Sequence, residues 1–157
     1  MERDRDREQE RLVFVIRATN VVETKMKRVI AAFINAPSER SSFVDSYLLN
    51  NATVPFGTKV KLVLAISRAL SLKVNREAMH VLPSRRNAFA HQDHLSSVRV
   101  LNGAGGYPDI DFVVESIKAS GELETVTQTR AFAEFVEAYA TVEADLDALL
   151  SALGNDA

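Results

Sequence analysis

A long apolar stripe near the C-terminus most constrains the fold. Apolar residues recur there at the spacing of one helical face, and the stripe ends at Gly154. Its members are Phe132, Phe135, Val136, Tyr139, Val142, Leu146, Leu149, Leu150 and Leu153. A helix with such a face needs other elements to cover it, and we expect Thr129 to cap its first turn. Because the stripe is longer than a small bundle needs to cover, it also favours a homodimer.

Other helices are expected ahead of this stripe. Segment 12–36 carries one apolar side and ends at a proline, and a short second helix is expected over 38–49. Segment 60–70 is apolar on most sides, which favours a central position. Segment 76–91 is also helical in pattern, but Pro83 cannot donate a backbone hydrogen bond. We therefore expect a kink or a restart of the helix at Pro83.

The pattern changes to that of a sheet between the last two helices. Residues 98–100, 110–117 and 123–126 are rich in β-branched side chains with partial alternation, and glycine-containing turns separate them. We expect a small antiparallel β meander over about 97–127, inserted before the last helix of a mainly α fold. The alternating charges of residues 1–11 predict a charged N-terminal extension, and 12–154 a single domain.

Composition excludes several classes of protein. The chain has 157 residues, 46% of them apolar, which suits one domain with its own core. Nineteen basic against 21 acidic residues give a formal charge of −2, so the overall field favours neither nucleic acid nor a membrane. The absence of cysteine excludes disulfides and thiolate chemistry. Without a signal peptide or an apolar run long enough for a membrane span, a cytoplasmic protein is expected.

The stretch PSRRNAFAHQ, residues 83–92, holds the candidate catalytic residues. Asn87 and His91 are four residues apart and share a helix face, while Arg86 lies about 140° from His91 around the axis. Arg86 and His91 can therefore flank one groove, with a fixed positive charge beside a group that carries protons near neutral pH. Such a pair is the minimum that RNA cleavage without metal requires. The structural alternative is that Arg86 pairs with an acid such as Glu23 and that His91 closes the helix end.

The motif resembles that of a known superfamily. Residues 86–91, RNAFAH, are similar to the R-N-x-x-x-H form of the Rx4-6H motif of the HEPN superfamily. Residues 54–70 resemble the segment that precedes the motif in the mannitol operon repressor-like branch. Together the resemblance covers roughly residues 54–92, about a quarter of the chain.

The resemblance implies a HEPN-like four- to five-helix bundle, usually dimeric, with the motif near a cleft at the subunit interface. Active members are metal-independent endoribonucleases, often toxins or antiviral effectors. By resemblance, Arg86 would stabilise the phosphorane, His91 would act as acid or base, and Asn87 would support it. The mannitol repressor-like branch is instead regarded as regulatory or non-catalytic.

Other features of the sequence are weaker signals. We expect Arg85 to be solvated, because neighbouring residues on a helix point about 100° apart. Residues 91–94 offer two histidines and one carboxylate but no third confident ligand, so no metal is expected, and no cofactor. The glycine-rich segment 103–106 precedes Tyr107 and a proline rather than a helix, which indicates a plain turn.

Three functions follow from these observations. We slightly favour a HEPN-like metal-independent endoribonuclease acting on RNA over the other two functions, because the Arg-Asn-His set is intact. The alternative is a non-catalytic HEPN-like regulator that acts through protein–protein contacts, with an antitoxin or a regulator as partner. Lysines and arginines in the helices either form an RNA-binding patch or solvate outer faces. A helix-turn-helix DNA binder over 60–82 is disfavoured, because its second helix is too apolar for a groove.

Overall fold

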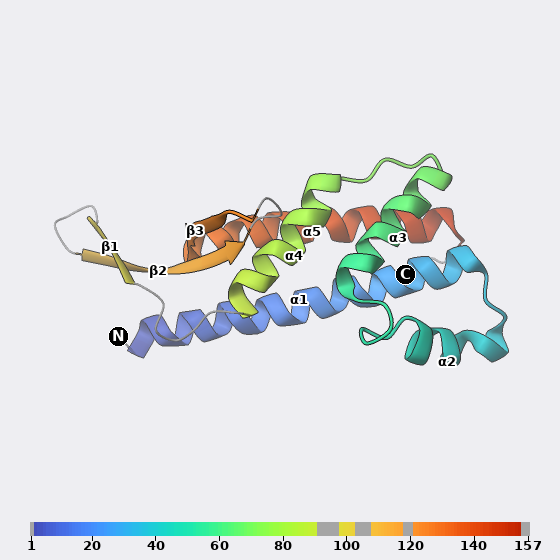
Figure 1. Ribbon diagram of the computed structural model, residues 1–157, viewed down its shortest axis with the longest axis horizontal. Helices are drawn as coiled ribbons and strands as arrows, with labels where there is room; N and C mark the ends of the chain where they lie inside the picture. The colour runs from blue at the N-terminus through green and yellow to red at the C-terminus, as the bar shows by residue number, and fades with distance from the viewer. Residues whose placement is uncertain (1, 91–97, 103–107, 118–120, 155–157) are drawn as a thin grey trace.

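The computed structural model describes residues 2–90, 98–102, 108–117 and 121–154, and it describes side chains for 6–90, 113 and 121–154. Within these ranges the protein is mainly helical and carries a three-stranded antiparallel sheet before its last helix (Figure 1). The elements are α1 (Glu2–Ile34), α2 (Ser41–Phe43), α3 (Phe56–Ala69), α4 (Arg76–Ala90), β1 (Val98–Asn102), β2 (Pro108–Ile117), β3 (Leu123–Thr127) and α5 (Gln128–Ala152). A 3-10 turn (Ser38–Arg40) precedes α2, and a π-helical turn (Val44–Leu48) follows it. None of the described helices is both long enough and apolar enough to cross a membrane.

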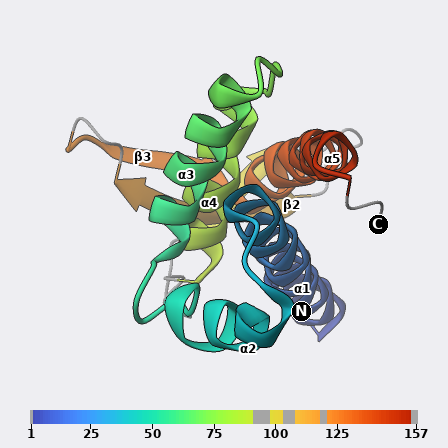
Figure 2. The same ribbon diagram turned by 90° about the vertical axis from the view of Figure 1, so that its right-hand side faces the viewer.

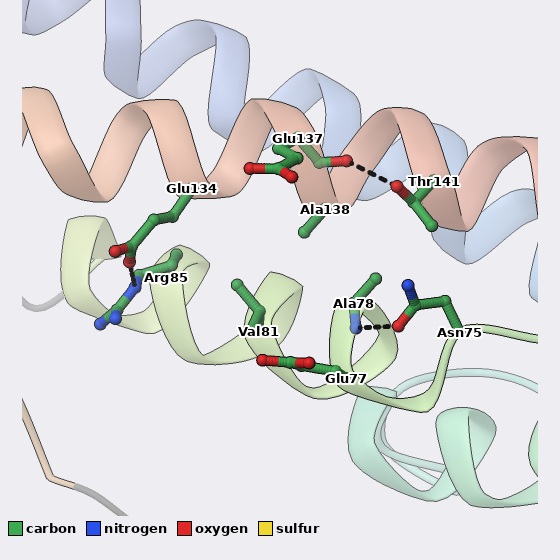
Figure 3. Close-up of a pocket in the computed structure, with 9 residues that line it drawn as sticks. All are labelled: Asn75, Glu77, Ala78, Val81, Arg85, Glu134, Glu137, Ala138 and Thr141. Carbon is green, nitrogen blue, oxygen red and sulfur yellow. Dashed lines mark hydrogen bonds and ion pairs between the residues drawn. The ribbon is translucent and has the colours of Figure 1, made fainter.

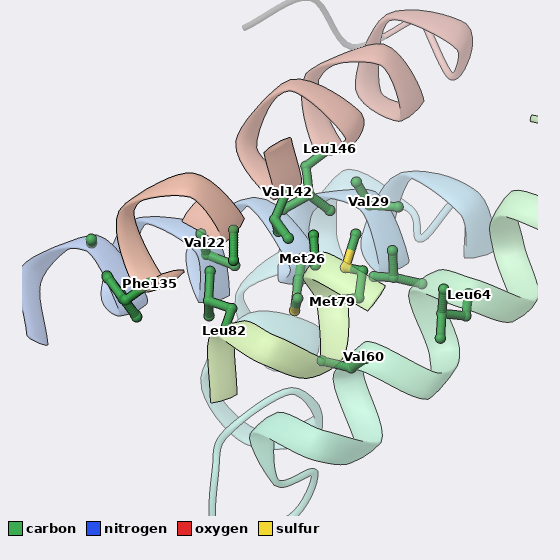
Figure 4. Packing of buried hydrophobic residues seen from close by; sticks show 14 of the residues in the cluster. Val22, Met26, Val29, Val60, Leu64, Met79, Leu82, Phe135, Val142 and Leu146 are labelled. Atoms are coloured by element: carbon green, nitrogen blue, oxygen red, sulfur yellow. The ribbon is translucent and has the colours of Figure 1, made fainter. Parts of the chain in front are cut away.

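The core forms where α4 packs against the long pair α1 and α5. Figures 1 and 2 show α1 and α5 side by side along the longest axis of the molecule. Buried side chains from all three helices, and from one face of α3, interdigitate there (Figure 4). They include Val22, Met26, Val29, Val60, Met79, Leu82, Phe135, Val142 and Leu146. Apart from Val136, which is exposed, the apolar stripe of α5 is buried or partly buried within the chain, and its length no longer argues for a dimer.

The predicted central helix lies instead at one side of the bundle. Val60, Val63 and Leu64 of α3 are buried, but Leu62 is exposed. The prediction of a central position was wrong because an apolar composition does not show how many faces of a helix are covered. Helix α3 buries one face only.

Helix α4 continues through Pro83, so the predicted restart does not occur. Pro83 removes one hydrogen bond of the helix. Leu82 before it and Phe89 after it are both buried in the core. Packing on both sides of the proline thus holds one continuous helix over Arg76–Ala90.

The predicted meander is confirmed by the pairing of its strands. The order is β1-β2-β3, and β2 is antiparallel to both neighbours. Strand β1 pairs with residues 108–112 of β2, and β3 pairs with residues 113–117. The two hairpins are thus staggered along β2. The second rests on the helices, since Val113 and Val126 are buried.

Residues 2–11 do not form a separate extension. Helix α1 begins at Glu2 and includes them. Arg11 donates hydrogen bonds from Nη1 to Gln128 Oε1 at 3.3 Å and Thr129 Oγ1 at 3.2 Å. Its guanidinium also lies over the ring of Phe132, 5.4 Å from the centroid. These contacts with α5 support a helical segment whose own charge pattern is only weakly stabilising.

The N-cap of α5 is Thr127 rather than Thr129. The Oγ1 of Thr127 accepts a hydrogen bond from the backbone N–H of Arg130 at 3.3 Å. Both threonines suit a cap by type. Strand β3 decides between them, because it ends at Thr127, whose extended backbone has the conformation of an N-cap.

Removing this cap should destabilise the protein. We expect Thr127→Ala to lower the free energy of unfolding by about 1 kcal/mol, because a donor in the first turn of α5 loses its acceptor. Thr129→Ala is the matched control, and its effect should stay within about 0.5 kcal/mol, since its hydrogen bond with Arg11 is exposed to solvent. Urea denaturation measures both. Equal losses in the two variants would contradict the assignment of the cap.

Candidate functional site

Two neighbouring arginines of α4 have opposite environments. Arg85 is buried, with 8% of its surface exposed, whereas Arg86 is exposed. The prediction that Arg85 is solvated was therefore wrong. The sequence did hold a signal, because Ala78, Leu82, Arg85 and Phe89 follow one another at the four- and three-residue spacing of one helix face. Arg85 lies on the face that α4 turns to the core.

Arg85 joins three elements of the fold. Its Nε donates to Glu134 Oε2 of α5 at 2.6 Å, and its Nη1 donates to Glu124 Oε2 of β3 at 2.7 Å. Arg130 Nε also donates to Glu134, to Oε1 at 2.8 Å. Burial alone would lower the pKa of Arg85, but the hydrogen bond to Glu124 and the charges of Glu134 and Glu124 raise it. Arg85 is thus a permanent cation, and each of its three side-chain nitrogens already donates a hydrogen bond inside the molecule.

Arg86 is free to meet a ligand. Its Nη1 donates to Asn87 Oδ1 at 3.1 Å, and it forms no ion pair with any residue the structure describes. The suggested structural partner Glu23 is taken by another cation, since Lys59 Nζ lies 2.6 Å from Glu23 Oε1. The side-chain amide of Asn87 therefore holds a guanidinium whose remaining donors face solvent. His91, the third candidate, lies outside the described residues.

Aromatic packing fixes the end of α4 on which Arg86 and Asn87 lie. The rings of Phe89 and Phe132 contact edge to face, with centroids 6.3 Å apart. Phe132 in turn contacts Phe14 of α1, with centroids 5.6 Å apart. Helices α1, α4 and α5 thus meet at the C-terminal end of α4. The exposed pair stands on a rigid support, as a binding site requires.

A pocket of about 370 Å³ lies between α4 and α5. Figure 3 shows its lining, with the Arg85–Glu134 pair at one end. The lining residues are Asn75, Glu77, Ala78, Val81, Arg85, Glu134, Glu137, Ala138 and Thr141. The lining holds three carboxylates and a single guanidinium, which is already paired with Glu134, so the pocket disfavours phosphate. Arg86 and Asn87 are not among the lining residues.

The pocket was not predicted from the sequence. Its acidic residues are spread over two helices, and only their packing brings them together. Among the side chains that the structure describes, no three His, Cys, Asp or Glu residues are placed to hold a metal ion. The segments 91–94 and 103–106 lie outside the described residues.

The protein is thus a mainly helical bundle with an antiparallel sheet inserted before its last helix. Near the C-terminal end of α4 it carries Arg86, an arginine that forms no ion pair with any described residue. Searches of protein-family models, curated proteins and solved structures found no match to this chain.

Proposed function

We propose that the protein is a metal-independent endoribonuclease of HEPN type, with a toxin or antiviral role. The observation that carries the proposal is the free guanidinium of Arg86, held by Asn87 at a rigid helix end, five residues ahead of His91. A planar guanidinium with unused donors suits the bidentate binding of a phosphate. The adjacent Arg85 is not available to bind a phosphate in this way, because it forms ion pairs with Glu124 and Glu134.

The proposed reaction is transfer of a phosphoryl group within the RNA strand. The ribose 2′-oxygen attacks its own 3′-phosphorus, a 2′,3′-cyclic phosphate forms, and the bond to the 5′-oxygen breaks. His91 accepts the proton of the 2′-hydroxyl, and the leaving 5′-oxygen receives a proton from water. Arg86 stabilises the negative charge that develops on the phosphate oxygens. Asn87 keeps the guanidinium in place through the 3.1 Å hydrogen bond.

The second candidate is a non-catalytic regulator that acts through protein contacts. Phe43 and Tyr47 favour it, because they are 61% and 67% exposed and their rings stack with centroids 5.4 Å apart. An exposed aromatic pair is typical of protein interfaces. It lies on α2 and the π-helical turn rather than beside Arg86.

The test of the ribonuclease is cleavage of RNA by the wild-type protein in excess chelator. We expect products that end in a 2′,3′-cyclic phosphate, because the attacking group is the neighbouring 2′-hydroxyl. A matched oligonucleotide with a 2′-deoxyribose at the cleavage site should stay intact. Absence of cleavage over a panel of structured and single-stranded RNAs, or cleavage only with divalent metal, would contradict the proposal and favour the regulator.

A further inference from the structure

The segment from residue 46 to residue 76 contains no aspartate or glutamate, although the whole chain carries 21 acidic against 19 basic residues. Its five cations are Lys59, Lys61, Arg68, Lys73 and Arg76. Lys59 is buried and pairs with Glu23. The other four are exposed, and none of them forms an ion pair with a residue that the structure describes. This segment, which holds α3 and the start of α4, therefore concentrates positive charge in a chain that is acidic overall.

Two of these cations lie at the edge of α3 that faces α4. Helix α3 packs against α1 and α4, as Figures 1 and 2 show. Lys59 marks the side toward α1, because its partner Glu23 lies on α1. Lys61 and Arg68 lie about 160–180° around the axis from Lys59, but within about 60° of the buried Leu64. They therefore border the side that is covered by α4, and they are about 10 Å apart along the axis.

Helix α4 carries two more exposed arginines on the side that faces α3. Met79 of α4 is buried in the same cluster as Leu64 of α3 (Figure 4). Arg76 and Arg86 lie within about 60° of Met79 around the axis and about 15 Å apart along it. Arg86 is the residue proposed above to bind the reacting phosphate. The facing edges of the two helices thus carry one set of exposed cations, and we call it the α3–α4 face. Its members are Lys61, Arg68, Arg76 and Arg86.

The opposite side of α4 carries the opposite charge. Glu77 lies about 160° around the axis from Met79 and lines the pocket together with two glutamates of α5. Asp145 of α5 approaches the start of α4, where it accepts a hydrogen bond from the backbone N–H of Asn75 at 2.7 Å. Helix α4 therefore separates an acidic surface beside α5 from a basic surface beside α3. A polyanion is repelled by the first surface and attracted by the second.

We propose that the α3–α4 face binds the phosphate backbone of the RNA substrate and leads the strand to Arg86. The inference rests on the proposed ribonuclease function, since RNA is the substrate of that reaction. Lys61, Arg68 and Arg76 neutralise phosphates that do not react, whereas Arg86 holds the phosphate that does. The first three are thus positioning residues. Because contacts with the backbone carry no sequence information, the face contributes affinity and not a preference among bases.

The number of contacted phosphates sets the salt dependence of binding. Each phosphate neutralised on a single strand contributes about −0.7 to the slope of the logarithm of the association constant against the logarithm of the salt concentration. Four contacts therefore predict a slope of about −2.8, and the loss of two leaves about −1.4. At roughly 0.1 M salt, two lost contacts correspond to about 25-fold weaker binding, and the difference should vanish toward about 1 M.

Binding can be measured apart from cleavage by fluorescence anisotropy. The probe is a labelled single-stranded 2′-O-methyl RNA of about 12 nucleotides, which lacks the attacking hydroxyl. Lys61→Gln/Arg68→Gln is the test variant and should show the reduced slope. Arg17→Gln/Arg28→Gln is the matched control, because it also removes two exposed cations. These lie on α1 about 120–140° around the axis from Glu23, which faces α3. The control should keep the wild-type slope and bind within about twofold of the wild type.

Cleavage kinetics distinguish the positioning residues from the catalytic ones. On cleavable RNA, Lys61→Gln/Arg68→Gln should raise KM and leave kcat within about twofold of the wild type, because its contacts are equal in the ground state and the transition state. Circular dichroism should show the wild-type helix content in every variant, since all the replaced side chains are exposed.

Three results would overturn the inference: a wild type that does not bind the probe, equal losses of affinity in the test variant and the control, or a fall of kcat in the test variant. None of them decides the proposed function, which cleavage in chelator tests separately. Conversely, binding that depends on Lys61 and Arg68 in a protein that cleaves no RNA would support the α3–α4 face and overturn the ribonuclease.

Discussion

Lys59→Met is expected to lower the free energy of unfolding by about 3 kcal/mol, because it leaves the largely buried carboxylate of Glu23 without its cation. Lys59 has 0% of its surface exposed. Its Nζ donates to Glu23 Oε1 at 2.6 Å and to Asn51 Oδ1 at 2.8 Å. Methionine keeps the length and apolar character of the lysine stem but removes the charge. The melting temperature should fall by roughly 6–12 °C, measured by thermal denaturation.

A double variant distinguishes two contributions to the lost stability: the loss of the Lys59–Glu23 ion pair and the cost of leaving the Glu23 carboxylate buried without a cation. Glu23→Leu combined with Lys59→Met should recover most of the lost stability, since apolar replacements of a buried ion pair are often neutral. Lys25→Met is the matched control. Lys25 pairs with Glu143 and Asp147, whose side chains are partly exposed, so its loss should cost only about 1 kcal/mol. An equal loss in Lys25→Met and Lys59→Met would show that burial of the pair does not set the cost.

Acid titration gives a second measure of the same pair. Burial raises the pKa of Glu23, but hydrogen bonds from Lys59 and Asn51 and the charge of Lys59 outweigh it, so the pKa lies below its ordinary value of 4.5. A carboxyl with a lowered pKa stabilises the fold above the unfolded value and loses that contribution as the pH falls through the folded value. In Lys59→Met the hydrogen bond and charge of Lys59 are lost, so we expect the pKa of Glu23 to lie above its value in the wild type. The deficit of Lys59→Met should therefore be largest above about pH 4.5 and shrink below it.

Arg86→Ala is expected to lower the rate of RNA cleavage about a hundredfold, because the phosphate loses a charged donor that acts in the transition state. The melting temperature should stay at the wild-type value, since Arg86 is exposed and its one described hydrogen bond joins it to the adjacent Asn87. Single-turnover cleavage in chelator measures the rate. Arg86→Lys should restore only part of it, because an ammonium keeps the charge but loses the fork of donors.

The adjacent arginine provides the control on the same helix. Arg85→Ala should lower the free energy of unfolding by about 3 kcal/mol, because Glu124 and Glu134 lose a buried partner. Assayed below its melting temperature, this variant should retain most of the cleavage rate. If Arg85→Ala loses as much activity as Arg86→Ala while still folded, the free guanidinium is not what carries catalysis.

The local sequence pattern predicted the helices and strands better than it predicted the burial and the ion pairs of their side chains. The helix over Gln128–Ala152 and the strands Val98–Asn102 and Leu123–Thr127 follow from spacing and β-branching within each segment. The same spacing places Arg85 on the core face, but it was predicted in solvent because only one of two adjacent arginines was expected to face the groove. The Lys59–Glu23 pair had no local signal, since it joins residues 36 positions apart.

For the candidate site, the sequence could predict which residues take part but not their environment. The motif places Arg86 and Asn87 next to each other on one helix, and the hydrogen bond between them is local. Whether a guanidinium stays free depends on carboxylates from other elements. Those contacts arise from packing, which a single sequence does not encode at short range.

Strand β3 leads into helix α5 without a loop, so the register of the strand fixes the rotation of the helix about its axis. Thr127 is both the last residue of β3, paired with Val113, and the N-cap of α5. A slip of β3 by one residue against β2 would move the start of α5 by about 3.3 Å. It would also change which side of the following helix meets α1, because each residue turns a helix by about 100°. The register of the β2–β3 hairpin therefore determines which side of α5 carries its apolar stripe toward α1. The bundle can close only if these two strands pair in the correct register.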